Sequence, residues 1–189
     1  MTTGLLHIDD RDWVQVRRAI ERLPGEIKTK AMSRAMRRMT QMARTAIVDS
    51  NAKQVKLPKE VIGSLTTAAF NAGGNTSKVV VESGWIPLRR LGAVQDASGV
   101  YVNLRGSYRH AFIAAFKSGH VGVLRRIPGT SMLSNPRKEQ IRELFGPNPA
   151  HAITNNPDVY LEVIAGLIED RLYPRYVHEL DFIISRAGR

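Results

Sequence analysis

The chain has 189 residues, a net charge of +11 and 43% apolar residues, enough for one domain, with or without extended arms, around a real core. It contains no cysteine, which excludes a disulfide scaffold, thiolate metal sites and thiol catalysis. Two adjacent acids, Asp9 and Asp10, precede any long apolar run, and no segment approaches the roughly 18 apolar residues of a membrane span. We therefore expect no signal peptide, no membrane partner and a protein kept in a cytosol.

The positive charge is concentrated in the middle of the chain. Residues 1–50 carry 10 Lys/Arg and 6 Asp/Glu, residues 51–136 carry 11 and 3, and residues 137–189 carry 7 and 8. Such a basic region favours a polyanionic partner, nucleic acid first, because lysine and arginine neutralise phosphates and release counterions. The alternative is a solvated surface that only keeps the protein soluble.

The N-terminal third predicts two helices. In residues 10–22, Trp13, Val16 and Ile20 recur every three or four positions, and Pro24-Gly25 interrupts the pattern. A second, longer helix is predicted over residues 26–48, with one side made of small and apolar residues. Its other side is cationic and carries Arg34, Arg37, Arg38 and Arg44.

The middle of the chain predicts strands. Residues 78–88 and 99–106 are rich in β-branched and aromatic residues and are bounded by Gly, Ser and Asn. Residues 111–116 and 121–127 flank a turn and predict a β-hairpin, although Ala and Phe leave the first of them open to a short helix. A polar, glycine-rich loop is expected at 71–77.

The C-terminal part begins with a rigid corner made of Gly146, Pro147, Asn148 and Pro149, where two prolines stop any helix or central strand. A helix is then predicted from Asn156-Pro157-Asp158 onward, broken or kinked at Pro174, and a second helical stretch ends the chain. The fold class is α+β: long N-terminal helices, a small central antiparallel sheet with a hairpin, and C-terminal helices. We expect a single domain over 1–189, with a helical arm (1–50), a basic β-rich core (51–136) and the corner with its helices (137–189).

No catalytic, metal or cofactor-binding constellation is recognisable. The five histidines, at 7, 110, 120, 151 and 178, show no ligand spacing, and no carboxylates cluster beside them. No serine lies in a G-x-S-x-G elbow, and neither Gly73-Gly74 nor residues 119–122 match a phosphate-binding loop. The sequence therefore predicts a protein that is not an enzyme and needs no cofactor.

Arginines in or beside the predicted strands are the remaining candidates. They can present a cationic face to nucleic acid, with Tyr101 or Tyr108 as stacking groups, or they can pair with carboxylates of a neighbouring subunit. No sequence-reading motif is present, so any nucleic acid would be met through its charge. The candidates are Arg89, Arg90, Arg105, Arg109, Arg125 and Arg126.

The order of the motifs resembles the phage minor tail protein Z family and, more broadly, the neck and tail-completion proteins of long-tailed phages. The likeness runs over most of the chain, through "AMSRAMRRMTQMARTAI", "VKLPKEVIGSLTTAAF", "WIPLRRLGA", "GVYVNLRGSYRHAFIAAFKSGHVGVLRR" and "IRELFGPNPAHAI". Asn148 stands where the family typically has Ser, and Pro174 lies close to a common helix break of the family.

This resemblance implies a non-enzymatic virion protein that acts in tail completion and head-tail joining around the DNA channel. It implies a homo-oligomeric, hexameric ring in contact with the connector and with the tail terminator or tail tube, assembled in the host cytoplasm. The Gly146-Pro147 corner would turn the chain from the sheet into the closing helices, with Leu144 and Phe145 packed beneath it.

Two further expectations follow from charge. Arg34, Arg37 and Arg38 would face a neighbouring subunit's acidic C-terminal segment, where Glu162, Glu169, Asp170 and Glu179 lie.

The alternative function is that of a free, sequence-nonspecific nucleic-acid-binding protein. An enzyme, such as a nuclease or a wall hydrolase of the tail, is the third function considered.

Overall fold

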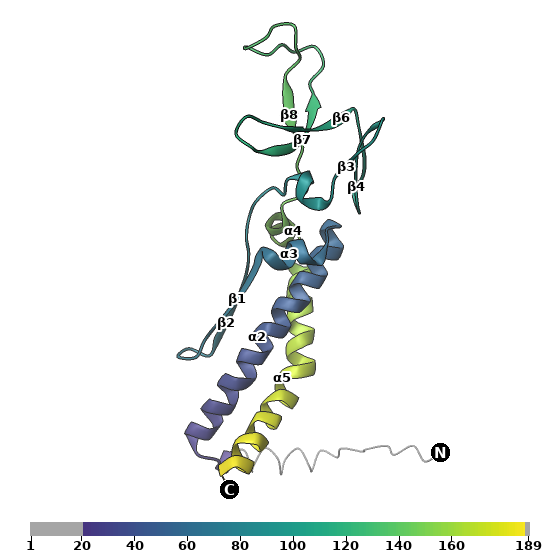
Figure 1. The fold of residues 1–189 in the computed structure, drawn as a ribbon. Helices are drawn as coiled ribbons and strands as arrows, with labels where there is room; N and C mark the ends of the chain where they lie inside the picture. Colours follow the sequence, from purple (N-terminus) through teal and green to yellow (C-terminus); the bar gives the residue numbers. More distant parts are fainter. Residues whose placement is uncertain (1–20, 188–189) are drawn as a thin grey trace, which may run out of the picture.

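The computed structural model describes residues 21–187 and shows an elongated molecule with a helical part at one end and a β-rich part at the other (Figure 1). We call the helical part the stalk: helices α2 (Gly25–Val55) and α5 (Pro157–Ala187) with the hairpin of strands β1 (Thr66–Asn71) and β2 (Thr76–Val81). We call residues 85–145 the head. The α+β prediction is confirmed. The helix expected at residues 10–22 lies almost entirely outside the described residues.

Helix α2 confirms the long helix predicted from residue 26 but continues seven residues beyond the predicted end at 48. Its last turns bury Val48, Ala52 and Val55, so tertiary packing extends it past the apolar pattern that was read from the sequence. The helix ends where Lys56 adopts a left-handed conformation, with φ of 52°, and its N–H donates to the Ala52 carbonyl.

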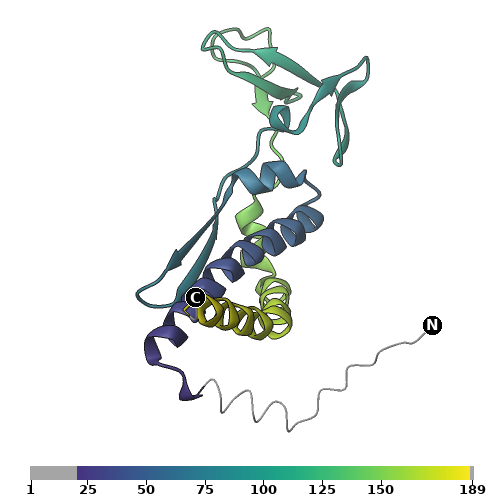
Figure 2. The ribbon, with the colours of Figure 1, turned by 60° about the horizontal axis from the view of Figure 1, so that its bottom comes forward.

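Helix α5 runs antiparallel to α2 along the stalk (Figure 1). Arg34 contacts Glu179 near one end of the pair, and Tyr160 donates a hydrogen bond to Gln54 near the other. Of the two alternatives predicted at Pro174, a break and a kink, the break does not occur, because α5 is continuous across this residue. Figure 2 shows the second half of α5 leaving the direction of the first, as expected when a proline removes one hydrogen bond inside a helix.

The β1–β2 hairpin lies along α2 and is held by polar side chains of that helix. Thr40 and Ser77 share a hydrogen bond of 2.6 Å between their hydroxyls, and the Arg44 guanidinium donates to the carbonyls of Gly63 and Thr66. The strand predicted over 78–88 is correct only to residue 81, and the expected loop at 71–77 is the turn of this hairpin. Strand β1 was not predicted, because its Thr-Thr-Ala-Ala segment carries little β-branched apolar character.

The head contains two three-stranded antiparallel sheets instead of one central sheet. The first is formed by β3 (Val94–Gln95), β4 (Gly99–Val102) and β5 (Gly106–Arg109), and the second by β6 (Ala111–Ala115), β7 (Val121–Arg126) and β8 (Ile141–Glu143). The β6–β7 hairpin confirms the prediction, so residues 111–116 do not form the alternative helix.

The segment 99–106 is not one strand. It is β4 followed by a tight turn, in which Leu104 has φ of 63° and an exposed fraction of 55%. The alternation of polar and apolar residues that predicted one strand therefore includes residues of a turn. The other wrongly predicted segment, the end of 78–88, leads through irregular chain into a short 3₁₀ helix, η1 (Leu88–Leu91).

The main hydrophobic core lies where the stalk meets the head. It joins the end of α2, helix α3 (Lys59–Ser64), η1 and strands of both head sheets. Its fully buried large side chains are Ile62, Leu88, Val100, Val102 and Val123. Because residues of both parts contribute to this one core, burial of its apolar side chains holds the stalk and the head together. In the described part of the chain, no helix has the length and apolar character needed to cross a membrane.

Candidate functional site

The histidines and carboxylates of residues 21–187 are scattered, and no three of these side chains form a group that could hold a metal ion. One pair is close: the His120 Nε2 atom lies 3.0 Å from both carboxylate oxygens of Glu143. His120 also stacks on Phe116, so the pair connects the β6–β7 turn to β8. This arrangement fixes the β6–β7 turn against β8.

The six predicted arginines all lie in the head, but they do not form one site. Arg89 and Arg90 are in η1, where Arg89 donates to the Ala93 carbonyl at 3.2 Å. Arg109 is exposed at the end of β5. Arg105 lies in the β4–β5 turn and donates to the Val55 carbonyl at 3.2 Å, so it connects the head to the end of α2. Arg105 is therefore partly a structural residue.

Arg125 and Arg126 lie at the exposed end of β7 and point to opposite faces of their sheet. The Arg126 guanidinium lies 5.5 Å from the centre of the Phe112 ring, a cation–π contact. Arg125 stands directly opposite Arg142 of β8. Like charges placed opposite each other in an antiparallel pair are destabilising, so this pair marks a surface suited to an anion.

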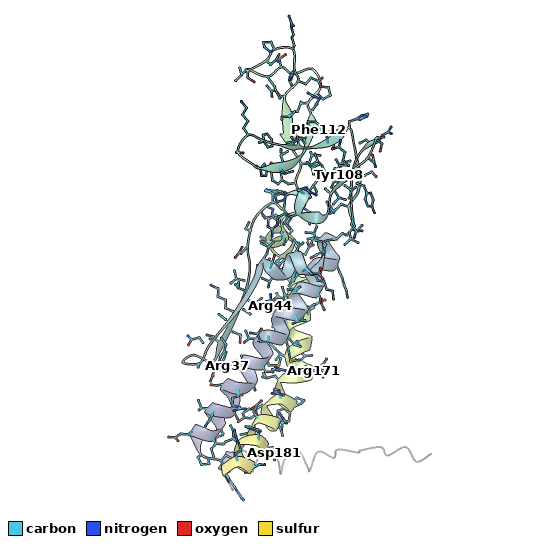
Figure 3. The ribbon with its side chains drawn as sticks, in the orientation of Figure 1. Arg37, Arg44, Tyr108, Phe112, Arg171 and Asp181 are labelled. Carbon is cyan, nitrogen blue, oxygen red and sulfur yellow. The ribbon has the colours of Figure 1, made fainter. Side chains whose placement is uncertain are left out.

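Arg142 was missed in the sequence, because only the register between β7 and β8 places it beside Arg125. The head as a whole has ten Lys/Arg and three Asp/Glu between residues 85 and 145. It therefore carries most of the net charge of the chain. Figure 3 shows Tyr108 and Phe112 in this part of the molecule, and Tyr108 packs against the core instead of standing free for stacking. Tyr101, in contrast, is exposed.

The stalk holds a second cationic region, built around a buried carboxylate. Glu179 is only 3% exposed, and its oxygens accept hydrogen bonds from Arg34 at 2.6 Å and from Arg175 at 2.7 Å. Burial raises the pKa of Glu179, but the hydrogen bond and charge of Arg34, with smaller effects of Arg175 and His178, outweigh it and hold the pKa below its ordinary value. The expectation that Arg34 meets Glu179 of a neighbour is wrong, because the pair forms within one chain.

An open groove of about 660 Å³ lies over this ion pair. We call it the stalk groove. Its cationic lining consists of Lys30, Arg34, Arg37, Arg38 and Arg175, and Glu179 is the one carboxylate among the described residues that line it. Figure 3 shows Arg37 on the side of α2 nearer the β1–β2 hairpin, and its guanidinium lies 6.0 Å from the Phe70 ring centre.

The Gly-Pro corner joins the head to the stalk. The Gly146 N–H donates to the Ile86 carbonyl at 2.7 Å, and a Cβ at position 146 would lie 3.0 Å from Leu91. Leu144 packs against the core as expected, whereas Phe145 is 45% exposed, so its predicted burial is wrong. Phe145 follows Leu144 in an extended segment, and successive side chains there point to opposite sides.

Asn148 and Pro149 complete the corner and begin helix α4 (Pro149–Asn155). The Asn148 side chain accepts a hydrogen bond from the Ala150 N–H at 3.1 Å and donates one to Ser83 at 2.9 Å. Buried Pro149 occupies the first helical position, and its carbonyl accepts from Asn51. Beside the corner, Trp85, Lys56, Arg105 and His151 line a cleft of about 530 Å³, in which Trp85 meets His151 edge to face.

Comparison of the chain with models of protein families, with curated proteins and with solved structures finds no match.

Proposed function

We propose that this chain is a structural virion protein of the phage neck or head-proximal tail end. In this role it acts in tail completion and head-tail joining around the DNA channel, as one subunit of a homo-oligomeric ring. The proposal includes contacts with the connector and with the tail terminator or tail tube, and non-enzymatic action. The motif order described above supports it.

One structural observation carries the proposal: the described residues expose as many large apolar side chains as they bury. Fourteen large apolar side chains are buried, whereas fifteen are exposed, among them Trp85, Val94, Leu133 and Leu161. Contiguous exposed apolar patches mark interaction sites, and a subunit of an assembly buries such patches against its neighbours.

Removing the chain from a phage that encodes it tests this proposal. We expect heads and tails that fail to join, or particles that lose their DNA, and we expect rings of the purified protein in negative-stain images. The chain supplied from a plasmid should restore infectious particles. Normal infectious particles in its absence would contradict the proposal.

A second candidate function is nonspecific binding of nucleic acid by the free protein. The observation that favours it is the basic head, where Arg125 and Arg142 face each other across two strands. The same surface suits nonspecific contact with packaged DNA in a channel, since phosphate contacts position a protein without reading sequence. Binding by the free protein and contact within a channel would use the same charged groups. They differ in whether the protein that contacts the nucleic acid is a single copy or part of a ring.

A further inference from the structure

The first half of α5 has an outer face without a partner in the described part of the chain. The Tyr160 side chain is buried and contacts Gln54 of α2, which fixes the face that is turned inward. Leu161, Ala165 and Ile168 follow one another at spacings of four and three on a different face of the helix. All three are exposed, Leu161 by 65% and Ile168 by 47%. They form an apolar stripe that no side chain of residues 21–187 covers.

Two carboxylates border this stripe. Glu162 and Glu169 are seven residues apart, so they lie on the same side of the helix, and both are exposed. The ion pairs of the described residues involve other carboxylates, those of Asp49, Glu143 and Glu179. We call Leu161, Glu162, Ala165, Ile168 and Glu169 the α5 outer face; it is both apolar and acidic.

The stalk groove has the opposite charge, and among residues 21–187 nothing fills it. Arg34 and Arg175 are paired with Glu179, but Lys30, Arg37 and Arg38 have no carboxylate within ion-pair distance among the described residues. The long aliphatic parts of these side chains can also cover apolar surface while their charged ends form ion pairs. The groove therefore suits a surface that is both acidic and apolar, which is the character of the α5 outer face.

We propose that the α5 outer face of one copy docks in the stalk groove of the next copy, with Glu162 and Glu169 meeting Lys30, Arg37 and Arg38. The contact is heterologous, because two different surfaces meet, and repetition of such a contact closes a ring when the rotation permits. A symmetric contact between two α5 outer faces is disfavoured, since it brings the carboxylates of both copies together. Duplex DNA fits the groove less well, because it would leave the apolar stripe uncovered.

The geometry sets one condition on the docking. Arg38 and Arg175 line the same groove, whereas Glu169 lies six residues along α5 toward the head, a rise of about 9 Å. Neighbouring stalks must therefore be staggered or inclined to each other. This inference deepens the proposed function and rests on it in one respect, that the chain acts as several copies.

Charge reversal on each surface tests the docking with the purified full chain. We expect Arg37→Glu with Arg38→Glu, and separately Glu162→Lys with Glu169→Lys, to weaken self-association at least about tenfold, measured by sedimentation velocity over a range of concentrations. An equimolar mixture of the two variants should associate again, because each acidic surface then finds a basic one. The control is Arg137→Glu with Lys138→Glu, the same charge change on the exposed head, which should leave association unchanged.

Several outcomes would overturn the docking: a monomeric wild-type chain at all concentrations, unchanged association of either variant, or a mixture that stays dissociated while circular dichroism shows both variants folded. Loss of short-duplex DNA binding by the Arg37/Arg38 variant with unchanged mass would assign the groove to nucleic acid instead. If association follows these charges but phage lacking the chain are normal, the docking stands and the proposed function fails. If the phage need the chain but its self-association does not depend on these charges, the proposed function stands and the docking fails.

Discussion

Glu179 is the residue whose environment is most unusual for its type. A carboxylate that is 3% exposed is costly unless it is paired, and here two guanidinium groups satisfy it. The Arg34 side chain remains 45% exposed, so it can return to water if its partner is lost. The Arg34–Glu179 and Arg175–Glu179 hydrogen bonds therefore stabilise the stalk mainly by satisfying the carboxylate. The Arg34 bond also holds the second half of α5 against α2.

Glu179→Gln should lower the free energy of unfolding at about pH 7 by about 1–3 kcal/mol, since charged hydrogen bonds are replaced by weaker neutral ones. The pKa of Glu179 is held below its ordinary value of 4.5, so its contribution is present above that pH and is lost as the pH falls through the lower folded-state pKa. The difference between wild type and variant should therefore shrink below pH 4.5. Urea unfolding at several pH values measures this.

A matched comparison is available in Asp49, whose ion pair with Lys59 is largely exposed. Asp49→Asn should change the free energy of unfolding by less than about 1 kcal/mol. Equal effects of the two substitutions, or a Glu179→Gln difference that grows in acid, would contradict the role given to Glu179.

At the scale of elements, the corner shows how a few residues set the direction of the chain. The Gly146 N–H bonds to Ile86, Asn148 caps α4, and Pro149 supplies the first turn of that helix without needing a hydrogen-bond partner for its nitrogen. Because Asn148 also bonds to Ser83, the corner holds the chain that enters the head next to the chain that leaves it. The same residue, Asn148, thus fixes both the start of α4 and the position of the chain that enters the head.

Asn148→Ala should lower the free energy of unfolding by about 1–2 kcal/mol, because it removes the cap of α4 and the hydrogen bond to Ser83. Asn148→Ser should cost less, since serine is a comparable cap, but it lacks the amide group that bonds to Ser83. Thermal unfolding of both variants compares the two contributions. Equal losses would show that the cap contributes nothing beyond the Ser83 contact.

At the scale of the whole molecule, shape and charge are separated along one axis. The head and the stalk lie at opposite ends of the molecule (Figure 1). The head carries most of the positive charge, the main core joins the head to the stalk, and α5 of the stalk carries exposed apolar residues. In the proposed ring, an elongated molecule of this kind would contact its neighbours along its side and present its basic end to a polyanion.

Arg125→Gln with Arg142→Gln should weaken binding of short duplex DNA and reduce the slope of log K against log salt by about two, if each arginine neutralises one phosphate. Fluorescence anisotropy over a salt series measures both quantities. Lys53→Gln with Arg171→Gln on the stalk is the control with the same loss of charge, and it should preserve the slope. Equal slopes for the two variants would remove the head from the nucleic-acid contact.

The sequence by itself determined the α+β class, the start of α2, the β6–β7 hairpin and the corner at Gly146–Pro149, because these features depend on local periodicity and on the fixed φ of proline. It identified the candidate arginines, but it did not predict which groups they contact. It failed at residues 82–88, where no strand forms, and at the turn around Leu104. At Pro174 it left a break and a kink as alternatives, and the structure shows one continuous helix.

Only the tertiary structure decided which charges meet. Glu179 bonds to Arg34 across 145 residues of sequence, and Arg142 stands beside Arg125 through the register of β7 with β8. Ion pairs and strand registers connect residues that are distant in the chain, so their partners follow from the packing of whole elements and not from spacing. The same packing distributed the apolar residues of α5, burying Tyr160 and leaving Leu161 and Ile168 exposed.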